Sequence, residues 1–150
     1  MRVRIGLLLL VVFALIAWNL RFGPYRLKRM VETGAAEAVQ RAQTEFGVEL
    51  DYSEGSIAKV EEIAAKVFAQ QPLAEERRAE LSKLLGVYLG EVARRNHGGQ
   101  WLIPKEGPLA GALVLRRGAG ETSPPSKVYR RLINGDEDNL TFYYQVLVRQ

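Results

Sequence analysis

The hydrophobic positions divide the chain into one long apolar run and several shorter amphipathic segments. Residues 5–20 read IGLLLLVVFALIAWNL, where only Asn19 is strongly polar. A helix over this run is about 24 Å long, somewhat shorter than the roughly 30 Å hydrocarbon core of a bilayer. Arg4 and Arg21 flank the run, and their side chains can extend toward the head groups. The pattern therefore predicts a single-pass membrane anchor within residues 1–22.

Two other interpretations of residues 5–20 stay open. MRVR has the basic character of the start of a signal peptide, and Leu15-Ile16-Ala17 is an imperfect cleavage site. Cleavage there would leave a secreted or periplasmic protein. A buried core helix is the third interpretation, which the flanking arginines and the apolar character on every side disfavour.

Basic side chains follow the apolar run closely and bear on both orientation and lipid contact. Arg21, Arg26, Lys28 and Arg29 outnumber the arginines before the run, which weakly favours a cytoplasmic domain by the positive-inside rule. The signal-like start favours the opposite orientation, so the side of the membrane is left open. In either case these four side chains can meet anionic lipid head groups, while residues 5–20 contact the bilayer itself.

The segment after the apolar run is polar and rich in alanine. Gly23-Pro24 predicts a break in the chain, and a helix over 26–46 is expected to end at Gly47. The predicted divisions are an anchor or signal sequence at 1–22, a basic juxtamembrane segment and stalk helix at 23–47, and a compact domain at 48–150.

Periodicity within the compact domain predicts both helices and strands. Apolar positions at helical spacing alternate with turn-rich segments, and two short β-rich stretches are joined by KEGPLAG. The expected elements are helices over 56–71, 74–95 and 126–135 and strands at 100–104 and 111–117. Residues 138–149 fit either a helix or a strand. The predicted fold class is α+β, a small helical domain with a short antiparallel β-hairpin, preceded by an N-terminal transmembrane helix.

The helix that ends in LLGVYLGEVARRNHGGQW carries two interior glycines. On a helical wheel of about 100° per residue, Gly86 and Gly90 extend the apolar face toward Ala93. Two such glycines cost roughly 2 kcal/mol of helix propensity relative to alanine. The expected compensation is a groove in which another backbone approaches closely. Gly98 and Gly99 then end the helix.

The polar end of the same helix offers the best candidate for chemistry. Glu91 precedes Arg95 by four residues, the favourable orientation for an ion pair, and Arg94 and Arg95 complement the negative end of the helix dipole. The competing hypothesis is a hydrolase-like site in which Glu91 acts with Arg94, Arg95 or His97. Trp101 either packs in the core or forms an exposed anchor for a partner.

Composition narrows the possible sites further. The chain has no cysteine and a single histidine, so zinc or di-iron sites would lack their usual ligands. Asp136, Glu137 and Asp138 are expected to cap a helix or face solvent. No catalytic, cofactor-binding or metal-binding residue is therefore assigned, and no cofactor is expected.

Charge and hydrophobicity exclude two broad classes of protein. Hydrophobic residues make up 47% of the chain and charged residues 25%, which excludes wholesale disorder. The net charge is +4, but three of the 21 Lys and Arg flank the apolar run, and the rest nearly balance the 17 Asp and Glu. Without a basic stripe to neutralise phosphates, a nucleic-acid partner is not expected.

Two motifs resemble a family of uncharacterised bacterial domains. LGVYLGEVARRNHGGQW and SKVYRRLINGDEDNL, followed by an aromatic pair, are similar to that family's pattern LGxYLGE, GGxW and KVxxRLxNG. The similarity covers about residues 50–145, and Ser123-Pro124-Pro125-Ser126 departs from the usual lead-in. The resemblance implies one domain of mixed helix and hairpin, to which a bacterial plasma-membrane anchor is an addition, and it implies no established activity.

The function expected from these features is a membrane-anchored, non-enzymatic protein-interaction module with an unidentified protein partner. The alternative is the hydrolase-like enzyme built on Glu91. A carboxylate in an open cleft with a raised pKa would favour the enzyme. A carboxylate paired along its helix, beside covered glycines, would favour the interaction module.

Overall fold

The computed structural model describes the backbone of residues 2–150 and the side chains of residues 23–150. The chain divides into two compact units, Met1–Met30 and Val31–Gln150. The side chains of the anchor or signal sequence predicted at 1–22 lie outside the described residues. Among the side chains described from residue 23 onward, no helix is long and apolar enough to span a membrane.

The second unit is mostly helical and has one small antiparallel sheet, as expected for the α+β class. Helix α1 (Arg2–Phe46) enters it at Val31. The other helices are α2 (Ser56–Phe68), α3 (Glu75–His97), α4 (Pro124–Asn134) and α5 (Leu140–Val148), with a 3₁₀ turn, η1 (Gly135–Asp138), before α5. The strands are β1 (Gln100–Leu102), β2 (Val114–Arg117) and β3 (Gly120–Thr122).

Helix α1 continues through Pro24, so the predicted break at Gly23-Pro24 is wrong. Proline removes one backbone hydrogen bond, but its fixed φ is compatible with a helix, and good helix formers follow it. The helix ends at Phe46, where Gly47 has a φ of +67°, and this confirms the predicted stop.

The compact unit begins earlier than the predicted start at residue 48. Val31, Ala35, Ala38 and Ala42 follow one another at spacings of three and four, and all are buried. These short side chains let the second part of α1 lie close to the other helices. The second part of the predicted stalk is therefore part of the domain.

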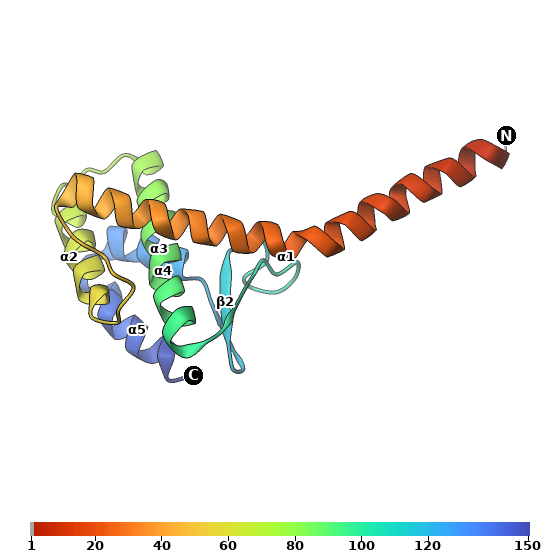
Figure 1. Cartoon of the computed structure of the whole chain (residues 1–150). Helices are drawn as coiled ribbons and strands as arrows, with labels where there is room; N and C mark the ends of the chain where they lie inside the picture. Colours follow the sequence, from red (N-terminus) through yellow and green to blue (C-terminus); the bar gives the residue numbers. More distant parts are fainter. Residues whose placement is uncertain (1) are drawn as a thin grey trace. The chain divides into compact units, whose positions relative to one another are not determined.

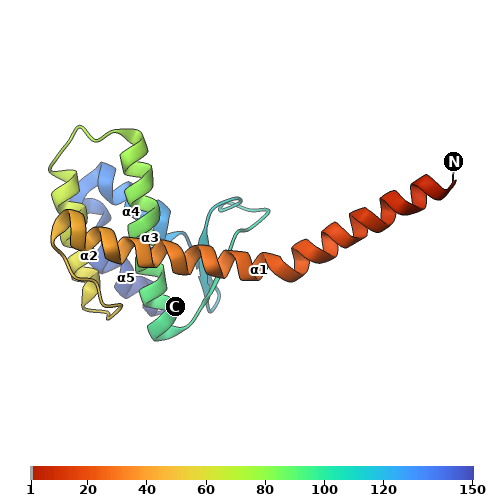
Figure 2. The ribbon, with the colours of Figure 1, turned by 45° about the horizontal axis from the view of Figure 1, so that its top comes forward.

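Helix α3 lies at the centre of this unit (Figures 1 and 2). In both views α2 and α5 lie on one side of α3 and the sheet lies on the other, while residues 31–46 of α1 cross it. Burial along α3 is nearly continuous from Leu81 to Ala93, apart from the exposed Lys83. Such a helix needs neighbours on most of its faces, which explains its central place.

The sheet confirms the predicted hairpin and adds a third strand. Strand β2 pairs antiparallel with β1, placing Trp101 opposite Leu115, and with β3, placing Leu115 opposite Thr122. Strand β3 lies outside the two strands predicted from the sequence. Its three residues carry no apolar alternation, so the sequence gives little sign of it.

Helix α5 resolves the ambiguity over residues 138–149. Leu140, Tyr144 and Leu147 are buried at helical spacing, although the segment is rich in β-forming residues. Asn139 is the N-cap, and its side chain accepts a hydrogen bond of 2.9 Å from the backbone nitrogen of Phe142. Tertiary packing therefore overrides the intrinsic preference of these residues.

Candidate functional site

The glycine face of α3 is occupied by the start of α4 and by Trp101. A Cβ built on Gly86 would lie 2.4 Å from the Cα of Pro125, and one built on Gly90 would lie 2.4 Å from the Trp101 ring. Both distances are far below a van der Waals contact. The groove predicted along this face therefore holds the backbone of α4 and an aromatic ring.

Glu91 is buried beside this contact and accepts four hydrogen bonds. Arg94 donates to both carboxylate oxygens, from Nη2 at 2.6 Å and from Nε at 2.9 Å. Arg95 Nε donates at 3.2 Å and Trp101 Nε1 at 3.1 Å. The ion pair predicted with Arg95 is present, but the bidentate pair with Arg94 is the stronger one. The side chain of Glu91 is only 1% exposed, so this carboxylate is fully partnered and shielded from solvent.

Electrostatics keeps the Glu91 carboxylate ionised. Burial alone would raise its pKa, but the hydrogen bonds from Arg94, Trp101 and Arg95 outweigh burial and lower it. A carboxylate that stays ionised and has its oxygens occupied is a poor general acid and a poor base. The arrangement is that of a structural anion which holds Trp101 against the helix.

The lowered pKa predicts how acid affects the stability of wild type and of a Glu91→Gln variant. An ionised carboxylate with a depressed pKa contributes stability above about pH 4.5, and this contribution is lost as the pH falls through the folded-state pKa. The melting temperature of wild type is therefore expected to fall more between pH 7 and pH 3 than that of Glu91→Gln. Thermal unfolding followed by circular dichroism measures this difference.

The exposed residue Glu62 supplies the control for this comparison. A Glu62→Gln variant is expected to keep the wild-type difference between pH 7 and pH 3. If Glu91→Gln were more stable than wild type at pH 7, the ionised carboxylate would destabilise the fold. That result would contradict the structural role proposed for Glu91.

Arg95 lies at the surface, whereas Trp101 is buried. The Arg95 guanidinium stacks on the ring of Tyr52 at 3.6 Å from its centroid, and Trp101 is only 8% exposed. The exposed-anchor interpretation of Trp101 is therefore wrong, since its ring packs over Gly90 and its N–H is bonded to Glu91.

His97 belongs to a different cluster from Glu91. Its Nε2 contacts the carboxylate of Glu54, which also accepts a hydrogen bond of 2.9 Å from the Tyr144 hydroxyl. The hydrogen bonds from His97 and Tyr144 lower the pKa of Glu54, and burial raises the pKa of Tyr144. The structure thus gathers Glu91, Arg94, Arg95 and Trp101, and it separates His97 from them.

Gly98 and Gly99 end α3 next to the sheet. Their φ angles are +78° and +127°, and a Cβ on Gly99 would lie 2.8 Å from the side chain of Arg117. Arg117 donates to the backbone oxygens of His97 and Gly98, at 3.1 and 3.0 Å, and to that of Leu147 in α5 at 2.6 Å. One guanidinium therefore caps the carboxyl ends of two helices.

The largest fully buried side chain among the described residues is Arg131, which the sequence reasoning missed. Its Nε donates to Glu61 of α2 at 2.7 Å, and its Nη2 donates to Asp136 at 2.9 Å. The other oxygen of Glu61 accepts from the backbone nitrogen of Leu140 at 2.7 Å. Helical spacing indicates this burial, because Arg131 lies three residues after the buried Val128 on the apolar side of α4.

Asp138 neither caps a helix nor faces solvent, but is held by two side chains of α4. Asp138 accepts from Lys127 Nζ at 2.5 Å and from Asn134 Nδ2 at 2.6 Å, and these contacts lower its pKa. Within the part of the chain that the structure describes, no group of three or more His, Asp or Glu side chains could hold a metal ion.

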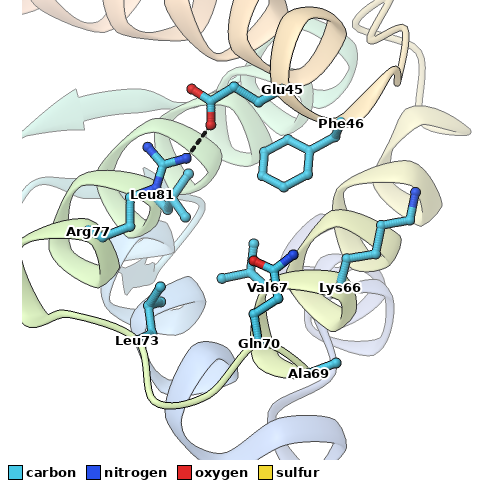
Figure 3. A pocket seen from close by; sticks show the side chains of 9 residues that line it. All are labelled: Glu45, Phe46, Lys66, Val67, Ala69, Gln70, Leu73, Arg77 and Leu81. Atoms are coloured by element: carbon cyan, nitrogen blue, oxygen red, sulfur yellow. Dashed lines mark hydrogen bonds and ion pairs between the residues drawn. The ribbon is translucent and has the colours of Figure 1, made fainter.

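A cavity of about 590 Å³ opens where the ends of α1 and α2 meet the start of α3. Figure 3 shows apolar side chains along it, Phe46, Val67, Leu73 and Leu81, with Glu45, Lys66 and Arg77 around them. Its size falls in the usual range for binding cavities. Local sequence patterns do not reveal this cavity, because its walls come from three helices.

An ion-pair network fixes the wall of the cavity formed by α1 and α3. Arg41 contacts Glu45 at 2.7 Å and Glu80 at 2.7 Å, and Arg77 contacts Glu80 at 3.0 Å. Arg77 also pairs with Glu45. These side chains are partly exposed, so the network adds little stability, but it holds the charged rim in place.

Comparisons of the chain with protein-family models, curated proteins and solved structures give no match. The resemblance to uncharacterised bacterial domains therefore stays a prediction.

Proposed function

We propose that this protein is a membrane-anchored, non-enzymatic module that binds a protein partner by taking one apolar side chain into the cavity of Figure 3. The observation that carries the proposal is the cavity's composition, with apolar walls inside and charged groups at the rim. Interfaces place their anchor residues in such pockets and surround them with polar contacts.

The apolar part of the cavity suits an aliphatic or aromatic side chain. Val67 and Leu81 are buried, while Phe46 and Leu73 are half-buried and keep part of their surface in the cavity. An apolar group that enters removes this surface from water, at about 25 cal/mol for each Å² buried.

The rim favours a negative charge on the partner beside the apolar group. Glu45 and Arg77 neutralise each other, whereas Lys66 forms no ion pair with any described residue. A carboxylate next to the inserted side chain would complement Lys66. The proposed partner segment therefore has an apolar residue adjacent to Asp or Glu.

The state of Glu91 supports the non-enzymatic part of the proposal. Its carboxylate is buried, fully hydrogen-bonded and has a lowered pKa, and it does not line the cavity of Figure 3. An acid or base poised for catalysis usually has a pKa shifted toward neutrality and access to substrate. The apolar run at 5–20 and the basic residues Arg21, Arg26, Lys28 and Arg29 support the membrane location.

Site-specific photo-crosslinking in native membranes tests the proposal. A photo-reactive phenylalanine analogue at Ala69, which lines the cavity, is expected to form one discrete protein adduct in the membrane fraction. Lys66→Glu is expected to lower its yield about three- to ten-fold, because one rim attraction becomes a repulsion. Deletion of residues 1–22 is expected to move the chain to the soluble fraction.

Ala65 is the matched control, since it is exposed on the same helix and does not line the cavity. The same analogue at Ala65 is expected to give no such adduct. The adduct supports the proposal only if the crosslinked segment of the partner has an apolar residue beside an Asp or Glu. Replacing that Asp or Glu of the partner with lysine must also restore binding to the Lys66→Glu variant. Equal adducts from both positions would contradict the proposed docking site, and a truncated chain that stays in the membrane would contradict the anchor.

A further inference from the structure

A second cavity, of about 520 Å³, lies between α3, β3 and the start of α4. It shares no lining residue with the cavity of Figure 3. Hydroxyl groups dominate its polar lining, and two basic side chains, Lys83 and Arg130, also line it.

Ser82 is the most informative residue of this cavity. It is only 3% exposed, and its hydroxyl has no hydrogen-bond partner among the described residues. Ser82 precedes Gly86 by one helical turn, so it lies on the face of α3 that Pro124 and Pro125 contact. Ser82 also lines the cavity, together with Ser123 and Pro125 at the start of α4. A buried hydroxyl without a partner destabilises the fold, and a bound acceptor can remove this cost.

The start of α4 provides a second hydroxyl that can donate. The Ser123 hydroxyl oxygen accepts from the backbone nitrogen of Ser126 at 3.4 Å and from the Ser126 hydroxyl at 2.9 Å. Its own O–H is thereby left to donate to another acceptor. The first turn of α4 holds no acidic side chain to balance the positive end of the helix dipole.

The charges around the cavity leave a positive excess. Lys83 forms no ion pair with a described residue, and Arg130 reaches Asp138 only at 3.9 Å. The one carboxylate in the lining, Glu121, is held by Arg116 at 2.5 Å and so is already neutralised. An anion is the ligand that satisfies both this excess and the free hydroxyl donors.

We propose that this cavity binds the phosphate group of a small organic phosphate. The phosphate oxygens accept from Ser82 and Ser123, and Lys83 and Arg130 balance the charge. A phosphate group has more acceptor oxygens than a carboxylate, which suits a lining of several hydroxyls. Pro125 and Leu109 give the organic part an apolar wall. This site is independent of the proposed protein-docking cavity.

Binding to the full-length chain in phosphatidylcholine nanodiscs tests the proposal. Titration calorimetry with phenyl phosphate is expected to show saturable binding, and inorganic phosphate is expected to compete for the same site. Ser82→Ala is expected to weaken binding about ten-fold, because a hydrogen bond to a charged oxygen is lost. Lys83→Ala is expected to weaken it about three-fold. Lys59→Ala, which removes a lysine outside both cavities, is expected to leave it unchanged.

Thermal unfolding supplies a second measurement that separates binding from folding. Ser82→Ala is expected to melt at or above the wild-type temperature without phosphate, because an unpartnered hydroxyl is removed. The same variant is expected to lose most of the stabilisation that phenyl phosphate gives to wild type.

Nanodiscs that contain phosphatidic acid distinguish the two sources of the phosphate group. Displacement of phenyl phosphate by this lipid would assign the site to a lipid head group, and competition by soluble phosphate esters alone would assign it to a soluble ligand. No binding by phosphate, phenyl phosphate or phosphatidic acid would mean that Ser82 is satisfied by water only. That result would overturn the proposal, as would binding that Ser82→Ala and Lys83→Ala leave unchanged.

Discussion

Replacing Gly86 with alanine is expected to lower the free energy of unfolding by about 2 kcal/mol or more, although alanine is the better helix former. The new Cβ would lie 2.4 Å from Pro125 Cα, 2.5 Å from Pro125 N and 2.8 Å from Pro124 C. All three are backbone atoms, so α4 itself must move away from α3. Urea unfolding followed by tryptophan fluorescence measures the loss, because Trp101 packs on the same helix face.

Gly34→Ala is the matched control for this substitution. Gly34 also lies inside a helix, but a Cβ there would meet only Val87 Cγ1, at an ordinary contact distance of 3.5 Å. This variant is expected to be neutral or to gain up to about 1 kcal/mol from helix propensity. Close packing of α4 on α3 would be refuted if the two substitutions changed stability in the same direction and by similar amounts.

Replacing Glu61 with alanine is expected to destabilise the domain by about 3–5 kcal/mol, because the buried Arg131 would keep only the exposed Asp136 as an ion-pair partner. Arg131 is 1% exposed and depends on Glu61 and Asp136 for its ion pairs. The same change also removes the acceptor for the backbone nitrogen of Leu140 at the start of α5. Chemical denaturation of wild type and variant at neutral pH gives the difference directly.

Two further variants show whether the loss comes from the buried charge. Glu62→Ala, at the exposed neighbouring position, is expected to change stability by less than about 0.5 kcal/mol. The double variant Glu61→Leu with Arg131→Met is expected to recover much of the loss, since a well-packed apolar pair can replace a buried ion pair. If the double variant were as unstable as Glu61→Ala, the lost hydrogen bond from the backbone nitrogen of Leu140, rather than the unpaired charge, would explain the effect.

These two sites differ in how much the sequence reveals. The glycines at 86 and 90 share a helix face, which is a local property, and the sequence therefore predicts a close contact there. The sequence does not identify the contacting group, because Pro124 and Pro125 are distant in the chain from α3. They return to α3 only after the chain has passed through all three strands of the sheet. Arg131 is a stronger case, since its burial depends on Glu61 and Asp136 from other elements.

In the candidate site, too, some contacts follow from the local sequence and others depend on tertiary packing. The pairing of Glu91 with Arg95 follows from helical spacing alone, and the structure confirms it. The N–H of Trp101 at Glu91 and the contact of His97 with Glu54 depend on how separate elements pack. Neither cavity can be predicted from the sequence for the same reason, because the walls of each come from three separate elements.

The sequence by itself determined the helical periods, the stop at Gly47, the first hairpin and the small-residue face of α3. Those features follow from backbone hydrogen bonds and side-chain spacing within a few residues. Only the tertiary structure decided that 138–149 is a helix, that Arg131 is buried and that Ser82 has an unpartnered hydroxyl. Each of these depends on groups that are distant in the chain, because burial and hydrogen-bond partners are set by packing rather than by local pattern.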